Sequence, residues 1–336
     1  MSVIIIAEAG VNHNGSLKCA MEMVHKAAEA GVDYVKFQTF KAENLVSASA
    51  KKAEYQKANC RGDDDSQLAM LRGLELTDKD FKALSEECHR LGIGFMSTPF
   101  DFDSIDTLAE IGMDYWKIPS GEITNLPYLR KIAAKGGKVI LSTGMSTLEE
   151  VEDAVEVLNK GGISKDNINL LHCTTQYPTP FDAVNLRAMD SLISLGCHSV
   201  GYSDHTLGYT VPIAAVALGA KIIEKHFTID KTMPGPDHKA SLNPEELKAM
   251  VKAIRETEEC LGSECKIVTE VERPNIAVAR KSIVAASHIT KGETLTEQNI
   301  TTKRPATGLS PMLWDVVIGS AAVRDYEPDD CIELNQ

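Results

Sequence analysis

Residues 201–206 (GYSDHT), read together with residues 224–227 (EKHF), decide which fold this chain is expected to adopt. Each stretch places a histidine, His205 or His226, just beyond a short apolar run that predicts a buried strand. If the two strands are parallel neighbours, both histidines stand at the same end and can share one divalent metal. A single histidine at a strand end is more often a structural residue, so the rest of the chain must decide.

Short apolar runs and amphipathic helical stretches alternate outward from this pair over most of the chain. Strands are expected at residues 4–8, 34–38, 94–97, 115–118, 138–142 and 168–173. The last two strands begin with the apolar runs at 197–200 and 221–223 and are expected to stop at His205 and His226. Helices are expected at 16–30, from 77 to 92, 104–111, 126–134, from a capping box at 146–149 to 159, 185–195, 211–218, and from 243 to 262. Eight strand–helix units predict a (β/α)8 TIM barrel. The alternative is a doubly wound open sheet, which would need a phosphate-binding Gly-rich turn, and the turn at 12–15 (NHNG) is not one.

The remaining segments divide the chain into domains. A polar stretch from 39 to about 76 is too long for an ordinary connection and is expected to be a lid or a partly helical insertion. After Gly262 the runs become short and are separated by turns. We therefore expect a barrel domain at 1–262, a linker at 263–281 and a small β-rich domain at 282–336.

Charge and composition exclude several classes of partner. The 35 basic and 48 acidic residues give a net charge of −13, which argues against nucleic acid or an anionic membrane surface as a partner. No apolar run reaches the length of a membrane span, and the N-terminus does not resemble a signal peptide. The eight cysteines form no Cys-x-x-Cys pair, which is typical of reduced thiols in a cytoplasmic enzyme.

Polar residues collect at the expected carboxyl ends of the strands, where a barrel of this type carries its active site. The lysines and hydroxyls there suit phosphate or carboxylate oxygens, the histidines suit a metal, and acids such as Glu8 and Glu122 suit proton transfer. Glu224 belongs to this ring, but the sequence suggests no particular role for it. These residues predict a metal-assisted enzyme that acts on a phosphorylated or carboxylated small molecule, by condensation, isomerisation or hydrolysis. The ring includes Glu8, Lys36, Gln38, Thr98, Lys117, Ser120, Glu122, Ser142, His172, Ser203, His205, Glu224, Lys225 and His226.

These strand ends resemble the sialic acid synthase family, which includes bacterial legionaminic acid synthases. The resemblance rests on residues 6–15 (IAEAGVNHNG), 35–38 (VKFQ), 97–100 (STPF), 117–122 (KIPSGE), 141–145 (LSTGM), 171–174 (LHCT), 177–178 (YP), 201–206, 224–227 and 235–238 (GPDH). Residues 291–293 (KGE) and 303–305 (KRP) resemble the antifreeze-like (SAF, β-clip) domain of that family. The resemblance implies a metal-dependent condensation of phosphoenolpyruvate with an open-chain 2-acetamido hexose, which releases phosphate by C–O cleavage.

The resemblance also implies a role for individual residues. Mn²⁺ or Mg²⁺ would bind His205 and His226 and polarise the sugar aldehyde. Glu8 and Glu122 would handle protons and water. The implied phosphoenolpyruvate contacts are Lys36, Thr98, Lys117, Ser120, Ser142 and Ser203, and the implied sugar contacts are Gln38, Tyr177, Asp237 and Arg304. Because Arg304 would reach the sugar from the antifreeze-like domain of another subunit, a domain-swapped homodimer is implied.

The acceptor sugar stays open at this level. Thr175 stands where many sialic acid synthases carry Asn, so both N-acetylmannosamine and a 2,4-diacetamido-6-deoxy analogue fit, giving N-acetylneuraminate or N,N'-diacetyllegionaminate. Another phosphoenolpyruvate-dependent aldol synthase is an alternative, but it would need a further basic cluster for a sugar phosphate. The other alternative, a sugar-acid-binding protein without activity, would have no need for the acids and lysines of the ring.

Overall fold

Eight parallel strands form one sheet in a computed structural model that describes residues 2–52, 54–59 and 65–335. The strands are β1 (Ile4–Gly10), β2 (Tyr34–Thr39), β3 (Gly94–Pro99), β4 (Tyr115–Ile118), β5 (Lys138–Ser142), β6 (Ile168–His172), β7 (Ser199–Asp204) and β8 (Ile222–His226). Strand β1 pairs with β2 on one side and with the last strand, β8, on the other. A doubly wound open sheet does not pair its first strand with its last, so the predicted barrel is confirmed.

A layer of apolar side chains fills the lower part of the barrel interior. Its members come from strands all around the ring: Ile6, Met96, Ile140, Leu171 and Ile222, with Ile4, Tyr34 and Tyr115 packed against them. At Gly201 of β7 an added Cβ would lie 2.3 Å from the backbone oxygen of Ile222. The glycine is therefore required for β7 and β8 to approach closely where the two histidines follow.

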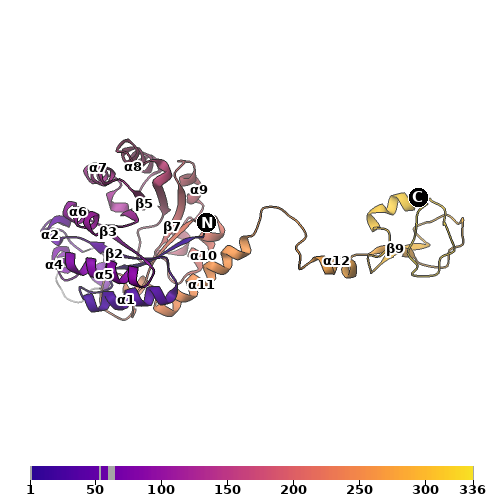
Figure 1. Ribbon diagram of the computed structural model, residues 1–336, viewed down its shortest axis with the longest axis horizontal. Coiled ribbons are helices and arrows are strands. Elements are labelled where there is room, and N and C mark those ends of the chain that lie inside the picture. The colour runs from indigo at the N-terminus through magenta and orange to yellow at the C-terminus, as the bar shows by residue number, and fades with distance from the viewer. Residues whose placement is uncertain (1, 53, 60–64, 336) are drawn as a thin grey trace. The chain divides into compact units, whose positions relative to one another are not determined.

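Helices cover the outside of the strands (Figure 1). They are α1 (Leu17–Ala30), α5 (Asp78–Arg90), α6 (Phe102–Ile111), α7 (Leu126–Lys135), α8 (Leu148–Lys160), α9 (Ala188–Ile193), α10 (Thr210–Ala217) and α11 (Pro244–Leu261). Three begin with capping boxes, from Thr77, Thr147 and Asn243. The capping box predicted at 146–149 was wrong by one residue, because the side chain of Ser146 instead donates to the backbone oxygen of Gly144 at 3.2 Å.

Other strands and helices begin or end at residues that differ from those predicted. Strand β1 continues to Gly10 instead of ending at residue 8. His205 follows β7 directly and His226 is the last residue of β8, so both strands end at a histidine, as predicted. The predicted helix at 185–195 forms only as α9. Apolar composition marks the centre of a strand better than its polar end, because the residues that face a cavity keep the strand conformation without being hydrophobic.

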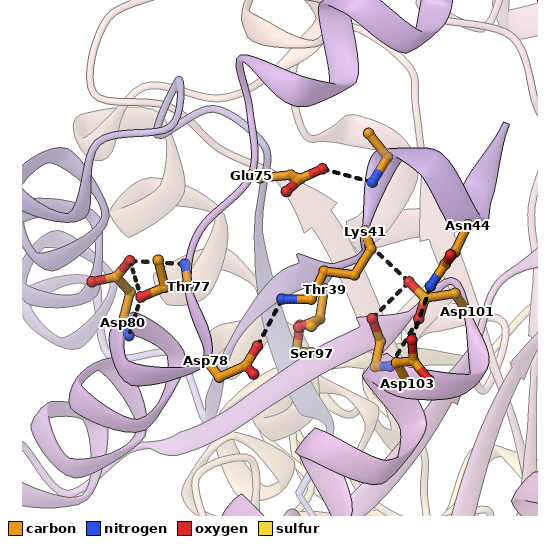
Figure 2. A network of polar contacts seen from close by, with 12 residues as sticks. Thr39, Lys41, Asn44, Glu75, Thr77, Asp78, Asp80, Ser97, Asp101 and Asp103 are labelled. Atoms are coloured by element: carbon orange, nitrogen blue, oxygen red, sulfur yellow. Dashed lines mark hydrogen bonds and ion pairs between the residues drawn. The ribbon is translucent and has the colours of Figure 1, made fainter. Parts of the chain in front are cut away.

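The segment between β2 and α5 is partly helical, as predicted, with α2 (Ala42–Leu45), α3 (Glu54–Asn59) and α4 (Gln67–Arg72). Hydrogen bonds hold the two ends of this segment in place (Figure 2). The backbone nitrogen of Lys41 donates to Asp101 at 2.8 Å and its ammonium to Asp78 at 2.9 Å, while the nitrogen of Ala42 donates to Glu75 at 2.6 Å. The two ends of the insertion are therefore bonded to each other, and the first end is also bonded to Asp101 at the rim of the barrel.

The chain divides into two compact units, Met1–Gly262 and Ser263–Gln336. The second unit contains α12 (Arg273–Ala279), the antiparallel strands β9 (Ser282–Ala285) and β10 (Ile300–Lys303), and α13 (Trp314–Val317). The helix α12 lies within the segment expected to be a linker. This unit has a hydrophobic core of its own, made of Ile283, Ala285, Ile289, Leu295, Ile300, Val317, Ala322, Tyr326 and Ile332.

Two expectations concern the chain as a whole. No helix among the described residues is long and apolar enough to cross a membrane. Seven of the cysteines are free thiols, and Cys60 lies outside the described residues.

Candidate active site

The candidate site arises from the alternation of side chains along the barrel strands. Two residues further along most of these strands, toward the carboxyl end, the next side chain that faces inward is polar. On β8 the order is Ile222, Glu224, His226, and on β7 it is Gly201, Ser203, followed by His205. The polar layer consists of Glu8, Lys36, Thr98, Lys117, Ser142, Ser203 and Glu224, all of which are buried.

A cavity of about 580 Å³ opens above this layer. It is lined by every barrel residue to which the family resemblance gave a role except Glu122: Glu8, Lys36, Gln38, Thr98, Lys117, Ser120, Ser142, Tyr177, Ser203, His205, His226 and Asp237. His172 and Lys225, which the sequence also placed in the ring, do not line it. The wall that comes from the insertion is largely apolar, with Phe40, Leu45, Val46, Met70, Leu71 and Leu74, and it also carries Gln56 and Gln67. The cavity therefore has a charged floor and one largely apolar side.

Two buried lysines stand at the floor. The ammonium of Lys36 forms an ion pair with Glu8 and donates to the hydroxyl of Thr98 at 3.1 Å. The ammonium of Lys117 donates to the hydroxyl of Ser142 at 2.7 Å. Burial alone would lower the pKa of Lys36, but the carboxylates of Glu224 and Glu8 raise it. The pKa of Lys117 is lowered by burial and by the charge of Lys36. Each ammonium has three donors, so both keep some for an anionic ligand.

Glu8, Gln38 and His226 converge at one point of the rim. The amide of Gln38 donates to Glu8 at 3.2 Å. A Cβ added at Gly10, where φ is +52°, would lie 3.1 Å from Glu8, 3.4 Å from Gln38 and 3.5 Å from the ring of His226. Glycine at this position therefore leaves the space that these three side chains share. Burial raises the pKa of Glu8, and burial together with Glu8 raises the pKa of Asp237 to about 7.

The two histidines are close neighbours, with ring centroids 5.6 Å apart. Nδ1 of His205 lies 2.7 Å from the backbone oxygen of Thr174, so this nitrogen donates and Nε2 is left as the acceptor. Nδ1 of His226 is buried and has no hydrogen-bond partner among the described residues. Burial lowers the pKa of His205 to about 4 and that of His226 well below its usual value. Both rings are therefore neutral and carry a nitrogen lone pair, as a metal ligand must.

The histidine pair fits a divalent cation only if further ligands come from outside the protein. Among the described residues, no group of three or more His, Cys, Asp or Glu side chains is arranged to hold a metal. A two-histidine site would leave coordination positions for water or substrate, which is a feature of catalytic sites. The ring of Tyr177 lies 4.1 Å from that of His205, centroid to centroid, and covers one side of the pair.

Glu122 is not among the residues that line this cavity, and Arg304 belongs to the second unit of the chain. Glu122 is half-buried, accepts a hydrogen bond from Asn125 at 2.6 Å, and is absent from the described cavity lining. Burial raises its pKa. Arg304 is exposed and follows β10 in the second unit of the chain. Ser120 does line the cavity, where its hydroxyl accepts from the backbone nitrogen of Gly144 at 2.9 Å.

Sequence reasoning missed two features of the cavity. It gave no role to Glu224, although Glu224 has the same parity along β8 as His226 and so had to face inward. It also did not foresee the apolar wall, because no local pattern says against which strand ends the insertion packs.

The chain was also compared with families and structures of known proteins. A model of the NeuB family matches residues 23–266, and a model of the SAF domain matches residues 280–335. The chain is 53% identical over 98% of both chains to an N,N'-diacetyllegionaminic acid synthase of Campylobacter jejuni. It is 48% identical to a synthase of the same name from Legionella pneumophila, over 95% of this chain and 90% of the relative. A crystal structure of an N-acetylneuraminic acid synthetase from Leptospira borgpetersenii superposes with a TM-score of 0.72 at 35% identity, over 82% and 90% of the two chains.

Proposed function

This chain belongs to the NeuB family and is a synthase that condenses phosphoenolpyruvate with an amino sugar, and we propose that the sugar is 2,4-diacetamido-2,4,6-trideoxymannose, giving N,N'-diacetyllegionaminate. The observation that carries the choice of sugar is the 53% identity over 98% of both chains to a synthase of that name. An N-acetylneuraminate-9-phosphate synthase of Homo sapiens is 33% identical.

The apolar wall of the cavity supports the same sugar. A 6-deoxy sugar carries a methyl group where N-acetylmannosamine carries a hydroxymethyl group, and a second acetamido group adds another methyl. Val46, Leu71 and Leu74 offer apolar contacts to such groups and no partner for a hydroxyl. An apolar pocket favours an additional methyl group but rejects a hydroxyl only moderately, so we expect a preference rather than an absolute selection.

The lysines and hydroxyls of the floor would hold phosphoenolpyruvate. The π electrons of its C2–C3 bond form the new bond from C3 to the aldehyde carbon of the sugar, whose oxygen takes up a proton. A water molecule then adds to C2 and loses one proton, which leaves a hydroxyl on C2. The bond from C2 to the phosphate oxygen breaks with its electron pair going to phosphate, the hydroxyl gives up its proton to the leaving phosphate, and the 2-keto acid remains. Glu8 is the carboxylate placed to move these protons, since it lines the cavity beside His226 and Gln38. Glu122 would need to move to take part.

A divalent ion, Mn²⁺ or Mg²⁺, is part of the proposal. His205 and His226 would hold it, and when bound it supplies a Lewis acid that polarises the aldehyde. The orientation of His205 by the backbone oxygen of Thr174 and the unsatisfied nitrogen of His226 support this assignment. Electron paramagnetic resonance of Mn²⁺ mixed with metal-stripped protein tests it directly, because free and bound Mn²⁺ differ in signal whether or not the enzyme turns over.

We also propose that the active form is a cytoplasmic homodimer in which the SAF domain of one subunit supplies Arg304 to the cavity of the other. The exposed apolar side chains of the second unit support a docking role, since Met312 is 91% exposed and Val316 62% exposed. Phosphoenolpyruvate is a cytoplasmic metabolite, and the seven described cysteines are all free thiols. The molar mass from light scattering tests the dimer.

The substrate is tested by measuring phosphate release from phosphoenolpyruvate in the presence of Mn²⁺ and either sugar. We expect release with both, and a kcat/KM at least about 10-fold higher for the 2,4-diacetamido-6-deoxy sugar. A higher kcat/KM with N-acetylmannosamine would overturn the choice of sugar. Release with neither would overturn the synthase assignment itself.

A further inference from the structure

Glu224 is a buried acid at the floor of the cavity, and it takes no part in the proposed binding of the two substrates or in the proposed transfer of protons. It stands on β8 between Ile222 of the apolar layer and His226 of the rim, and it is 5% exposed. Its Oε1 accepts a hydrogen bond from Ser203 at 3.0 Å and lies 3.6 Å from the ammonium of Lys117. Its Oε2 lies 3.7 Å from the ammonium of Lys36.

The two oxygens of Glu224 are not satisfied equally. Oε2 is buried and accepts no hydrogen bond from any described residue. A buried carboxylate oxygen without a donor costs free energy, and such a group in a native protein calls for an explanation. Structure alone does not require it, since glutamine could accept from Ser203 in the same way and leucine would extend the apolar layer.

The charge of Glu224 also opposes the binding of substrate. Phosphoenolpyruvate carries a phosphate and a carboxylate, and its anchors Lys36, Lys117 and Ser203 are the three groups that surround Glu224. A third anionic group among them weakens the attraction for an anion. The ammonium groups of Lys117 and Lys36, at 3.6 and 3.7 Å, are the counter-ions that a charged carboxylate needs at this buried position.

The reaction creates one place where this negative charge is favourable. When the C2–C3 π electrons leave to form the carbon–carbon bond, C2 becomes electron-poor until water adds to it. C2 is the carbon that joins the carboxylate and the phosphate oxygen of phosphoenolpyruvate, so a molecule anchored by both groups places C2 between the anchors and hence near Glu224. A fixed charge aimed at charge that develops only in the transition state accelerates the step without improving ground-state binding.

We propose that Glu224 is a catalytic residue whose negative charge stabilises the electron-poor C2 of phosphoenolpyruvate while the carbon–carbon bond forms, at the expense of ground-state binding. The inference rests on the proposed function, because it assumes phosphoenolpyruvate on the lysines of the floor. It distinguishes Glu224 from its neighbours Lys36, Lys117 and Ser203, which act as anchors. Glu224 forms no bond to the substrate and exchanges no proton in this role.

The test is the Glu224→Gln variant, which keeps the acceptor for Ser203 and removes the charge. We expect kcat to fall by about 10²–10³-fold, while KM for phosphoenolpyruvate and its Kd from calorimetry without sugar stay the same or decrease. Glu224→Asp, which keeps the charge but moves it by one methylene, should recover part of kcat. Thermal melting of both variants shows whether they fold.

Thr98→Ala is the matched control, since Thr98 contacts Lys36 in the same layer but carries no charge. We expect Thr98→Ala to raise KM for phosphoenolpyruvate more than it lowers kcat, whereas Glu224→Gln should lower kcat without raising KM. A folded Glu224→Gln variant with full kcat, or with a raised Kd for phosphoenolpyruvate, would overturn the proposal. The calorimetric arm needs no acceptor, so it remains decisive if neither sugar is a substrate and the proposed function fails.

Discussion

Two clusters of buried lysine and carboxylate lie on opposite faces of β7 and β8. On the outer face, Lys225 and Asp204 form an ion pair of 2.6 Å, and both side chains are fully buried. Asp204 also accepts from the hydroxyl of Tyr202 at 3.1 Å, and from the backbone nitrogen and hydroxyl of Thr206 at 3.1 and 3.0 Å. On the inner face, Lys36 and Lys117 stand 3.7 and 3.6 Å from Glu224.

The clusters differ in how completely their hydrogen bonds are satisfied. Each oxygen of Asp204 accepts two hydrogen bonds, which leaves nothing for a ligand. In the inner cluster one oxygen of Glu224 has no donor, and the ammoniums face a cavity. Buried charge that is fully paired holds a structure together, whereas buried charge left incomplete beside a cavity is arranged for a ligand.

The largest effect that separates the clusters should come from Lys117→Met. We expect kcat/KM for phosphoenolpyruvate to fall about 10³-fold or more, because a buried charged donor to the substrate is lost. The free energy of unfolding should change by less than about 1 kcal/mol, since water in the cavity can solvate the carboxylate left behind. Phosphate release and urea denaturation measure the two quantities. A loss of stability without a loss of turnover would show that the inner cluster is structural.

Lys225→Met should show the reverse. Removing one partner of a fully buried ion pair leaves Asp204 charged without a counter-ion, so we expect about 3–4 kcal/mol lower stability, measured by urea denaturation. The KM of the folded fraction for phosphoenolpyruvate should stay within about twofold of that of the unaltered enzyme, because Lys225 does not line the cavity. The double variant Lys225→Met/Asp204→Asn, in which neither charge remains, should recover part of the stability. If it is less stable than Lys225→Met alone, then charge pairing does not explain the outer cluster.

His205→Ala tests whether the rim of the inner face is a metal site. We expect the affinity for Mn²⁺, measured by paramagnetic resonance, to fall about 100-fold or more with the loss of a ligand. Metal removal by a chelator should abolish turnover of the unaltered enzyme, and added Mn²⁺ should restore it. His25→Ala is the matched control, because His25 lies on α1 beside Glu87 and away from the strand ends. Equal Mn²⁺ affinity in both variants would contradict the assignment.

Arg304→Ala tests the contribution of the second unit. We expect KM for the sugar to rise about 10-fold, as for the loss of one charged hydrogen bond, with KM for phosphoenolpyruvate unchanged. Mixing this variant with His226→Ala should restore a site in mixed dimers, because one subunit then supplies an intact barrel and the other an intact arginine. No gain of activity after subunit exchange would argue against the swapped arrangement.

The smallest effect is expected at the apolar wall. Val46→Thr replaces a methyl group by a hydroxyl of similar size, and we expect the preference for the 6-deoxy sugar to fall by about 3–10-fold in kcat/KM. Val46→Ala controls for loss of contact without added polarity and should lower kcat/KM for both sugars similarly. An unchanged preference in Val46→Thr would place the specificity elsewhere in the cavity.

The strand–helix alternation, the barrel and the kinds of group at its rim could all be predicted from the order of residues in the chain. Alternating side chains and helix caps are local properties, so the chain order of apolar and polar residues is sufficient to predict them. The strand ends then collect at one rim because parallel strands require it. The same alternation separates Lys225 from Glu224 and His226, although the three residues are consecutive in the chain.

The packing of the folded chain sets which of these groups meet. It paired Glu224 with lysines from β2 and β4, turned Glu122 toward Asn125, and brought the insertion against the cavity as an apolar wall. These contacts join residues far apart in the chain, and they depend on barrel closure and on how loops pack over it, which no local pattern encodes. Whether a buried charge is satisfied is a property of its surroundings in space, and this is the difference between the outer and the inner cluster.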